Sequence, residues 1–509
     1  MKNSILTLAV AGAMTLPAFA KIEMGVPFAD GVVLQRDREV PVWGKAAPGR
    51  KVTVAFAGNE VSATACEKGC WKVMLPAMPA SKVSRSLVVT ECEEGWLWDS
   101  ECDRAEVKDV LVGEVWFCAG QSNTELPLCG GSPHFRDGKG AMRAQITRKP
   151  CVRFCYQSDY KTAVDPKRTA CLPVVWKTFT PENLLKAPSF SAMGVYFALE
   201  LYGALDIPVG IVGTYWGGTR VEPWTPACGF ESVAGLKSLA TQPVLDPAAF
   251  KAQKDAGKVK SRIQDQPRVL WNEMVQPWTP FAIRGFIWYQ GCSNAGDGLA
   301  YADKMQALYN GWAKEFANPG LKLYFVQLAP WGYEKIATIQ EGQAKFAAAE
   351  KNAGMAVIND CGCLTDIHPN DKETVGQRLA LLALKRDYGF DIKAESPTLK
   401  SSRVEGDAFV LEFNDVESWY LYNPDWTLGT AFEICGADGV WKPAKIVNAK
   451  GQDVVGKQYK CPGLIDGKAL TVRADGVAAP KRLRYLHSRP WKGNLYNEVN
   501  LPLGAFEIN

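Results

Sequence analysis

The feature that most constrains the fold is an alternation, between residues 108 and 394, of continuous apolar runs with longer stretches of helical periodicity. The apolar runs are DVLVGEVWFCAG, PVGIVGTYWGG, IRGFIWYQG, KLYFVQLAP and GMAVIND, and the helical stretches include FSAMGVYFALELYGAL and VGQRLALLALKRDYG. A strand that is apolar on both of its sides is buried on both faces, as in a parallel sheet covered by helices. We therefore predict an α/β domain over residues 107–394, with a parallel sheet and helices on both faces.

The sequence on either side of this region has a different hydrophobic pattern. Its apolar residues alternate with polar ones in short runs separated by turn residues. The runs before residue 106 include VVLQRDREVPVWG, KVTVAF, VSATAC and WKVMLP, and those after residue 395 include FVLEFND, TAFEICGADG, ALTVRAD and RLRYLHS. Period-two alternation of this kind is typical of antiparallel strands with one face on a core. We predict an N-terminal β domain over 21–106 and a C-terminal β domain over 395–509.

Residues 1–20 read MKNSILTLAVAGAMTLPAFA, with one Lys, a short apolar run and small residues at the end. This pattern predicts a cleavable signal peptide, and no later run is long enough to span a bilayer. We therefore expect a secreted or periplasmic protein without a membrane anchor. The 15 Cys residues fit an oxidising compartment, and local disulfides could join Cys66/Cys70, Cys92/Cys102, Cys151/Cys155 and Cys361/Cys363.

Composition excludes several classes of partner. The formal net charge of +4 provides no field that would attract nucleic acid. The 17 Trp residues fit a protein that stacks on sugar rings, although buried structural Trp explains them equally well. With only three His and no paired ligands at zinc spacing, no metal site and no cofactor are predicted.

Polar, glycine-rich sequences end three of the predicted strands, where ligands bind in open parallel sheets. They are Gly120-Gln121-Ser122-Asn123, Trp216-Gly217-Gly218-Thr219 and Gln290-Gly291-Cys292-Ser293-Asn294. Ser122 could simply cap a helix, but as a nucleophile it would need a base, usually His. His368, which follows the last predicted parallel strand and has Asp366 two residues before it, is a better candidate than His134 or His487.

These blocks resemble the SGNH (GDSL-like) hydrolases and, within them, the sialate O-acetylesterases. The matching blocks occur in the family's order: GQSN at 120–123, WGGT at 216–219, WYQGxSN at 288–294 and DIHPxDKxxVGxRLA at 366–380. The resemblance implies an SGNH-type sheet with Ser122 as nucleophile and His368 as base. It also implies an oxyanion hole formed by the Ser122 and Gly218 amides and the Asn294 side chain. Gln121, Asn123 and Gln290 are predicted to contact the substrate.

Three positions depart from the family pattern. Thr124 follows Asn123 where the family commonly has Met, a change expected to affect only the lining of the pocket. Cys292 stands where the family usually has Glu, which removes a carboxylate from the edge of the site. Asp366 precedes His368 by two residues rather than three, so either Asp366 orients the imidazole or the site is a Ser-His dyad aided by a backbone carbonyl. Asp360 and Glu341 are alternative carboxylates for that role.

The resulting functional prediction is a secreted, metal-independent serine esterase that needs no cofactor. Its predicted substrate is an acetylated glycan, with O-acetylated sialic acid favoured. An esterase for acetylated xylan is the alternative enzyme, because the same blocks would serve either substrate. A glycan-binding protein with an inactive hydrolase core is the alternative from another class.

Overall fold

The computed structural model describes residues 22–92, 102–130, 135–156, 160–167, 173–186, 190–331, 334–362, 366–422, 431–448, 450–454, 463–487 and 493–509. The predicted signal peptide lies outside these residues, as do His134 and Cys363.

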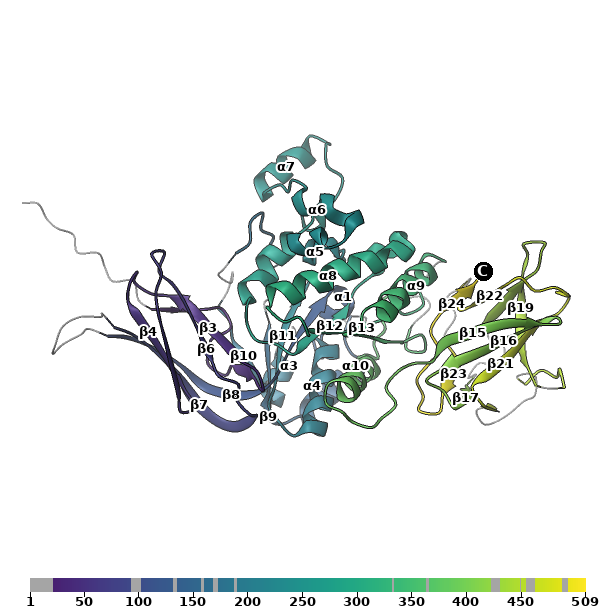
Figure 1. Cartoon of the computed structure of the whole chain (residues 1–509), viewed down its shortest axis with the longest axis horizontal. Helices are drawn as coiled ribbons and strands as arrows, with labels where there is room; N and C mark the ends of the chain where they lie inside the picture. Colours follow the sequence, from purple (N-terminus) through teal and green to yellow (C-terminus); the bar gives the residue numbers. More distant parts are fainter. Residues whose placement is uncertain are drawn as a thin grey trace, which may run out of the picture.

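A mainly parallel sheet forms the middle of the molecule (Figure 1). Its strands lie in the order β10 (Trp176–Phe179), β9 (Lys149–Tyr156), β11 (Val209–Tyr215), β8 (Asp103–Gly120), β12 (Gly285–Tyr289), β13 (Lys322–Val326) and β14 (Ala353–Ala356). All neighbours are parallel except β10, which runs antiparallel to β9. The central strand, β8, therefore ends between β11 and β12, so its last residue is flanked by two other strand ends.

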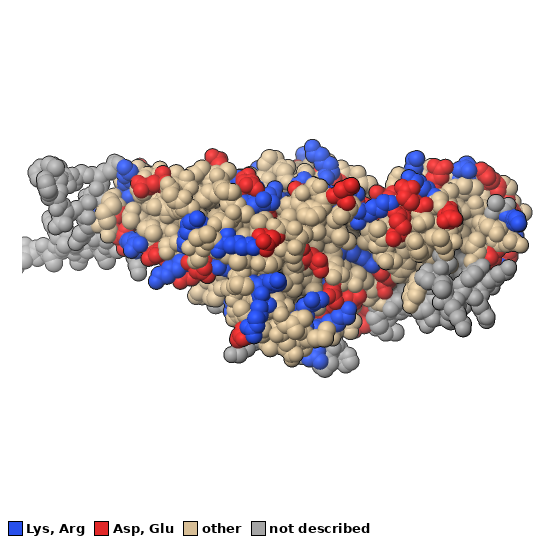
Figure 2. Space-filling view, turned by 90° about the horizontal axis from the view of Figure 1, so that it is seen from below, with Lys and Arg blue, Asp and Glu red and all other residues tan. Residues whose placement is uncertain are grey.

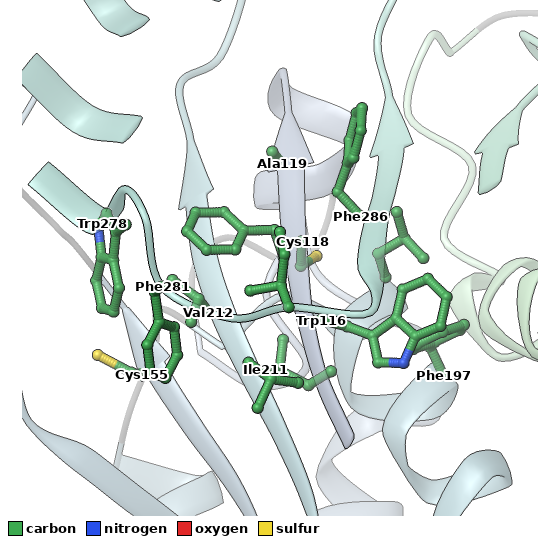
Figure 3. Packing of buried hydrophobic residues seen from close by; sticks show 14 of the residues in the cluster. Trp116, Cys118, Ala119, Cys155, Phe197, Ile211, Val212, Trp278, Phe281 and Phe286 are labelled. Atoms are coloured by element: carbon green, nitrogen blue, oxygen red, sulfur yellow. The ribbon is translucent and has the colours of Figure 1, made fainter. Parts of the chain in front are cut away.

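Consecutive residues of β8 point to opposite faces of the sheet, and both faces are covered. The Trp116 ring packs edge-on against Phe197, 5.2 Å between ring centroids, whereas the Phe117 ring packs against Trp312 and Phe316 at 5.9 and 5.3 Å. Figure 3 shows Trp116 and Phe197 together in this core. The apolar sequence on both sides of the strand is thus explained by one helix layer on each face.

The two layers are visible in Figure 1, with α4 and α10 on one side of the sheet and α8 and α9 on the other. The α-helices are α1 (Ser122–Glu125), α2 (Gly140–Ile146), α3 (Pro181–Lys186), α4 (Ala192–Leu205), α5 (Ala227–Glu231), α6 (Lys237–Thr241), α7 (Pro247–Asp255), α8 (Tyr301–Glu315), α9 (Glu334–Ala349) and α10 (Lys372–Arg386). Shorter 3₁₀ or π segments are η1 (Glu222–Trp224), η2 (Ala234–Leu236), η3 (Ile263–Asp265), η4 (Trp271–Val275), η5 (Gln276–Trp278) and η6 (Cys292–Ala300).

The N-terminal strands are β1 (Glu23–Met24), β2 (Val33–Gln35), β3 (Val40–Lys45), β4 (Lys51–Phe56), β5 (Asn59–Thr64), β6 (Cys70–Leu75) and β7 (Ser81–Cys92). They pair antiparallel, except that the short strand β2 is parallel to β8. Strands β1, β3 and β6 form a sheet of their own, whereas β4, β5 and β7 continue into the central sheet. β7 pairs antiparallel with the first half of β8, whereas the second half of β8 pairs with β11 and β12. The boundary predicted between residues 106 and 107 therefore falls inside a continuous strand.

The C-terminal strands form two antiparallel sheets around a core of their own. One has the order β15 (Thr398–Glu405), β16 (Ala408–Asn414), β21 (Ala469–Ala474), β19 (Trp441–Val447), β18 (Phe432–Cys435), β22 (Arg482–Tyr485) and β24 (Phe506–Ile508). The other has the order β20 (Gly463–Asp466), β17 (Ser418–Leu421) and β23 (Leu495–Asn497). Trp419 and Phe413 are buried in this core, with 4.8 Å between their ring centroids. The predicted fold class, a helix-covered parallel sheet flanked by antiparallel β regions, is confirmed.

One of the proposed local disulfides is present: Cys92 is joined to Cys102. Cys66, Cys70, Cys151 and Cys155 are free thiols. Cys151 and Cys155 both lie in β9, and four residues of extended strand separate them by roughly 13 Å, too far for a disulfide. A spacing of three intervening residues suits a turn or a helix rather than a strand, so the suggested bridge between these two residues is wrong.

Acidic and basic side chains are interspersed over the face shown in Figure 2, in keeping with the nearly balanced charge of the chain. Within the described parts of the chain, every helix is too short or too polar to cross a membrane.

Candidate active site

Ser122 and His368, predicted from distant parts of the sequence, lie together at the carboxyl end of the central sheet. The Ser122 Oγ and His368 Nε2 atoms are 2.9 Å apart, a hydrogen-bond distance. Ser122 begins α1 directly beyond β8, and His368 lies in the loop between β14 and α10. Both side chains are only partly buried, so a substrate can reach the pair. A hydroxyl hydrogen-bonded to an imidazole is the arrangement that nucleophilic catalysis requires.

Gly120 makes the sharp turn that brings Ser122 to the end of the sheet. Its φ of +145° is one that residues with a side chain rarely adopt. A β-carbon there would lie 2.4 Å from both the Thr124 hydroxyl and the Tyr289 carbonyl oxygen. Since Gln121 also donates its backbone N–H to the Tyr289 carbonyl at 3.1 Å, the turn is tied to the neighbouring strand β12. The sequence Gly-Gln-Ser thus fixes where the hydroxyl stands.

The His368 imidazole is held in an environment that favours its neutral form. The Phe135 ring packs edge-on against it, with 5.0 Å between the ring centroids. Burial lowers the pKa of His368 below its ordinary value, and the positive charge of Lys372 acts in the same direction while Asp366 opposes it. A neutral imidazole at pH 7 can accept the Ser122 proton.

Asp366 lies beside His368, but its hydrogen bond goes to the backbone rather than to the ring. The Asp366 Oδ1 atom accepts the backbone N–H of His368 at 2.9 Å, whereas the ring atom Nδ1 is 3.6 Å from the same oxygen. The latter separation is an electrostatic contact, not a hydrogen bond. The two alternative carboxylates are engaged elsewhere: Asp360 with Arg378 at 2.6 Å and Glu341 with His487 at 3.3 Å.

Lys372 is a buried residue of the site that sequence reasoning missed. Its Nζ atom donates a hydrogen bond to Asn123 Oδ1 at 2.7 Å and lies 4.9 Å from the centre of the Tyr289 ring. Asn123 in turn donates to the carbonyl oxygen of Ile367, the residue before His368, at 3.0 Å. Lys372 and Asn123 therefore link the nucleophile helix to the loop of the base. Burial lowers the pKa of Lys372 to about 7.

Asn294, predicted to be an oxyanion donor, is buried among polar side chains. Its amide nitrogen donates to Glu222 Oε2 at 3.1 Å and to Asp297 Oδ2 at 2.6 Å, so both amide hydrogens are used. Its oxygen accepts the Val221 N–H and the Gln290 amide, and the side chain is fully buried. Both amide hydrogens of Asn294 are thus engaged by carboxylates in this arrangement, and its role as an oxyanion donor stays a prediction.

The carboxylates that bind Asn294 belong to a buried ionic network. Lys304 Nζ lies 2.7 Å from both Glu222 and Asp297, and Arg220 lies 2.9 and 3.0 Å from the same two residues. Burial alone would raise the pKa of Glu222, but Arg220 and Lys304 lower it to about 2. The network thus joins the segments that follow β11 and β12.

The other residues predicted to contact the substrate are also buried beneath the site. Gln121, Asn123 and Gln290 are at most 2% exposed. Gln121 accepts the Gly291 N–H at 3.1 Å, and Gln290 accepts the Tyr301 hydroxyl at 2.6 Å. These side chains tie the strand ends together in this structure, and their contact with the substrate stays a prediction.

The backbone N–H groups of Ser122 and Gly218 donate no hydrogen bond to any described residue, in contrast to the Asn294 amide. Gly217, next to Gly218, lies against the nucleophile, because a β-carbon on Gly217 would be 3.4 Å from Ser122 Cβ. An oxyanion hole formed by the Ser122 and Gly218 amides therefore stays a prediction compatible with this geometry.

Cys292 occupies the place of the family's Glu without its charge. The side chain is partly buried, and burial raises the pKa of the thiol to about 12. The thiol is therefore neutral at physiological pH and cannot provide a carboxylate's charge at the site edge.

The comparisons with known proteins agree with this chemistry. Residues 112–385 match the family model described as carbohydrate esterase, sialic acid-specific acetylesterase. The chain belongs to this family. Family membership makes the protein a carboxylic ester hydrolase.

Individual relatives of this esterase support the same assignment. The sialate O-acetylesterase of Mus musculus is 28% identical over 70% of this chain and 72% of its own length. That of Homo sapiens is 27% identical over 70% and 69%. A solved structure of a carbohydrate acetylesterase from Xanthomonas citri is 31% identical, covers 96% of this chain and 99% of its own, and superposes with a TM-score of 0.78.

Proposed function

We propose that this esterase removes O-acetyl groups from sialic acid, with Ser122 as nucleophile and His368 as general base. The observation that carries the proposal is the 2.9 Å contact between Ser122 Oγ and His368 Nε2 at the end of the central strand. The names of the relatives, which describe sialate O-acetylesterases and a carbohydrate acetylesterase, support the substrate class.

The reaction proceeds in two halves. His368 takes the Ser122 proton as Oγ attacks the acetyl carbonyl carbon, and the charge that develops on the carbonyl oxygen is stabilised by the free backbone N–H groups at Ser122 and Gly218. The C–O bond to the sugar then breaks, and the sugar oxygen leaves with the proton from His368. In the second half, water gives its proton to His368 and attacks the acetyl-enzyme, which releases acetate and restores Ser122.

In this mechanism Asp366 acts on the imidazole through its charge. Its carboxylate oxygen lies 3.6 Å from Nδ1, close enough to stabilise the imidazolium that forms during each half-reaction. Its direct hydrogen bond to the His368 backbone holds the loop. In the proposed mechanism the site is therefore a Ser-His dyad, and the charge of Asp366 stabilises the imidazolium.

The test is acetate release from a panel of acetylated glycans, including O-acetylated sialic acid and acetylated xylan. Acetate release from O-acetylated sialic acid is the expected result. Acetate release from acetylated xylan alone would instead assign xylan as the substrate. Covalent labelling by a fluorophosphonate, mapped by peptide mass spectrometry to Ser122, separates an active esterase from an inactive glycan-binding protein.

We also propose that residues 1–20 are removed during export. The Cys92–Cys102 disulfide supports folding in an oxidising compartment. Sequencing of the mature protein recovered outside the cytoplasm is expected to begin at Lys21, and an uncleaved N-terminus would contradict the proposal.

A further inference from the structure

The site has a second set of side chains beside the nucleophile, on the β11 side, which the mechanism does not use. A β-carbon on Gly217 would lie 3.0 Å from Glu125 Oε2 and 3.4 Å from Ser122 Cβ. Gly217 is therefore flanked by a carboxylate and by the nucleophilic residue. Because Gly217 has no side chain, Glu125 and Ser122 can both come this close to its backbone.

Only one of the two oxygens of the Glu125 carboxylate accepts a hydrogen bond from a described residue. Its Oε1 atom accepts a hydrogen bond from the Tyr160 hydroxyl, whereas Oε2 accepts none from the described residues. Glu125 is partly exposed and has no ion pair with a described Lys or Arg. A carboxylate oxygen without a donor, beside the reaction centre, is a strong acceptor for a hydroxyl group.

Two aromatic rings extend from this carboxylate to the surface. The Tyr160 ring lies 5.2 Å from the Trp216 ring, and Tyr160 is 45% exposed. Trp216 is only partly buried, in contrast to core residues such as Trp116, Trp288 and Trp312, which are fully buried. Accessible rings close to a polar acceptor combine apolar contact area with hydrogen bonding, as sites for amphipathic ligands do.

We infer that Glu125, Tyr160 and Trp216 form a subsite that binds the polyol part of the ester. In an acetylated sugar, the carbon next to the one that bears the ester carries a hydroxyl group. That vicinal hydroxyl donates its hydrogen bond to Glu125 Oε2, while Tyr160 and Trp216 contact the carbon skeleton. The inference rests on the proposed function, because the ester must be bound at Ser122 for its neighbouring hydroxyl to reach Glu125.

The charge of Glu125 adds a condition on the substrate. A carboxylate beside the ester repels a second negative charge placed there, so the bound segment must be neutral and hydroxylated. An ester on a glycerol-like side chain meets this condition even when the sugar carries an acid group elsewhere. The subsite thus selects a local pattern, an acetate next to a free hydroxyl, rather than a complete sugar.

The experiment compares two small esters that differ in this pattern. We measure kcat/KM for 1-monoacetin, which has a hydroxyl next to the ester-bearing carbon, and for propyl acetate, which has none. In Glu125→Ala the ratio of the two values is expected to fall about tenfold, since hydrogen bonds to charged groups typically contribute that much or more. In Glu125→Gln, which keeps an acceptor oxygen, the ratio is expected to fall by less, about threefold.

Tyr160→Ala tests the aromatic part with an O-acetylated sialic acid as substrate, and we expect KM to rise about tenfold. Tyr422→Ala is the matched control, because Tyr422 is an exposed tyrosine, 54% accessible, just beyond β17 in the C-terminal β region. This control should leave all the constants unchanged.

The outcomes separate the two levels of the proposal. If the wild-type protein hydrolyses both esters but Glu125→Ala lowers both kcat/KM values equally, Glu125 has a structural role only and the subsite is wrong while the esterase mechanism stands. If the wild-type protein hydrolyses neither ester nor any acetylated glycan, the proposed function fails and the subsite fails with it. A ratio that falls in Glu125→Ala and is partly restored in Glu125→Gln supports the subsite.

Discussion

The nucleophile and the base reach the same point by different structural means. Ser122 lies two residues beyond Gly120, the last residue of β8, which is paired with β11 and β12 up to that point. His368 lies in a loop, where the Asp366 carboxylate, the Phe135 ring and the bond from Asn123 to Ile367 hold it. Backbone hydrogen bonds of the sheet thus position Ser122, whereas contacts of individual side chains position His368.

This difference indicates where a substitution changes stability and where it changes reactivity. On the side of β11 and β12, polar residues are buried and hydrogen-bonded to one another, so losing one leaves others without partners. On the side of His368, the contacts are fewer and partly exposed, and they act on a titrating ring. Substitutions there are expected to change the rate and its pH dependence more than the folding.

The strongest test of the comparison is Ser122→Ala. The described side-chain contact of Ser122 is its hydrogen bond to His368, so the variant should fold like the wild type. Acetate release is expected to fall about 10⁴-fold or more, as it does when the nucleophile of a serine hydrolase is removed. Thermal unfolding measured beside the rate gives the control. Turnover near that of the wild type in a folded variant would remove Ser122 from the mechanism.

Asn294→Ala tests the buried polar residues that follow β11 and β12. The substitution removes the hydrogen bonds from Asn294 to Glu222 and Asp297, and a hydrogen bond to a charged group typically contributes about 1.5–3 kcal/mol. Urea denaturation should therefore show a large loss of the free energy of unfolding. Serine is the matched variant, because it retains some hydrogen bonding. A fully stable Asn294→Ala protein whose kcat alone falls 10²- to 10³-fold would instead support Asn294 as an oxyanion donor.

Asp366→Asn tests the loop side. Asn can still accept the His368 backbone N–H, but it no longer stabilises the imidazolium by charge. We expect kcat to fall about 10- to 30-fold, less than the roughly 10⁴-fold loss seen where the Asp is directly bonded to the ring. Because Asp366 raises the pKa of His368, its removal should move the acid limb of the kcat/KM profile to lower pH. A loss near 10⁴-fold would mean that the 3.6 Å contact shortens into a hydrogen bond during catalysis.

The smallest expected effect comes from Lys372→Met. The positive charge of Lys372 lowers the pKa of His368, so replacing it by a neutral side chain should move the acid limb to higher pH. The shift should be under one pH unit, because burial is the larger cause of the lowered value. Lys139→Met is the control, since Lys139 lies on the surface, paired with Glu373. An unchanged acid limb in Lys372→Met would show that Lys372 acts only as a hydrogen-bond donor to Asn123.

The sequence predicted the parts of the site that depend on strand order. Polar residues at the ends of apolar runs meet at one edge of a parallel sheet, and on that basis Ser122 and His368 were paired across 246 residues. The same apolar runs predicted the fold class, because strands buried on both faces occur mainly in parallel sheets covered by helices. The family resemblance then supplied the assignment of the nucleophile and base.

The sequence could not predict which polar side chains face the substrate and which lie beneath it. Asn294, Gln121 and Gln290 have the composition of a binding site, but their hydrogen bonds turn inward. Whether an amide lies above or below a strand end depends on tertiary contacts that a motif does not contain. Lys372 was missed for the opposite reason: it belongs to the block that contains His368, yet only its burial gives it a role beside the base.

The length of β8 has a consequence for how the protein unfolds. This strand, Asp103–Gly120, is an edge partner of the N-terminal hairpins at one end and the central strand under Ser122 at the other. Its amides pair with both sets of strands, so separating the two sets breaks a single hydrogen-bonded ladder. The hairpin strands β4, β5 and β7 are therefore part of the same sheet as the active site. Amide exchange should protect these strands and the strand beneath the nucleophile as one cooperative unit.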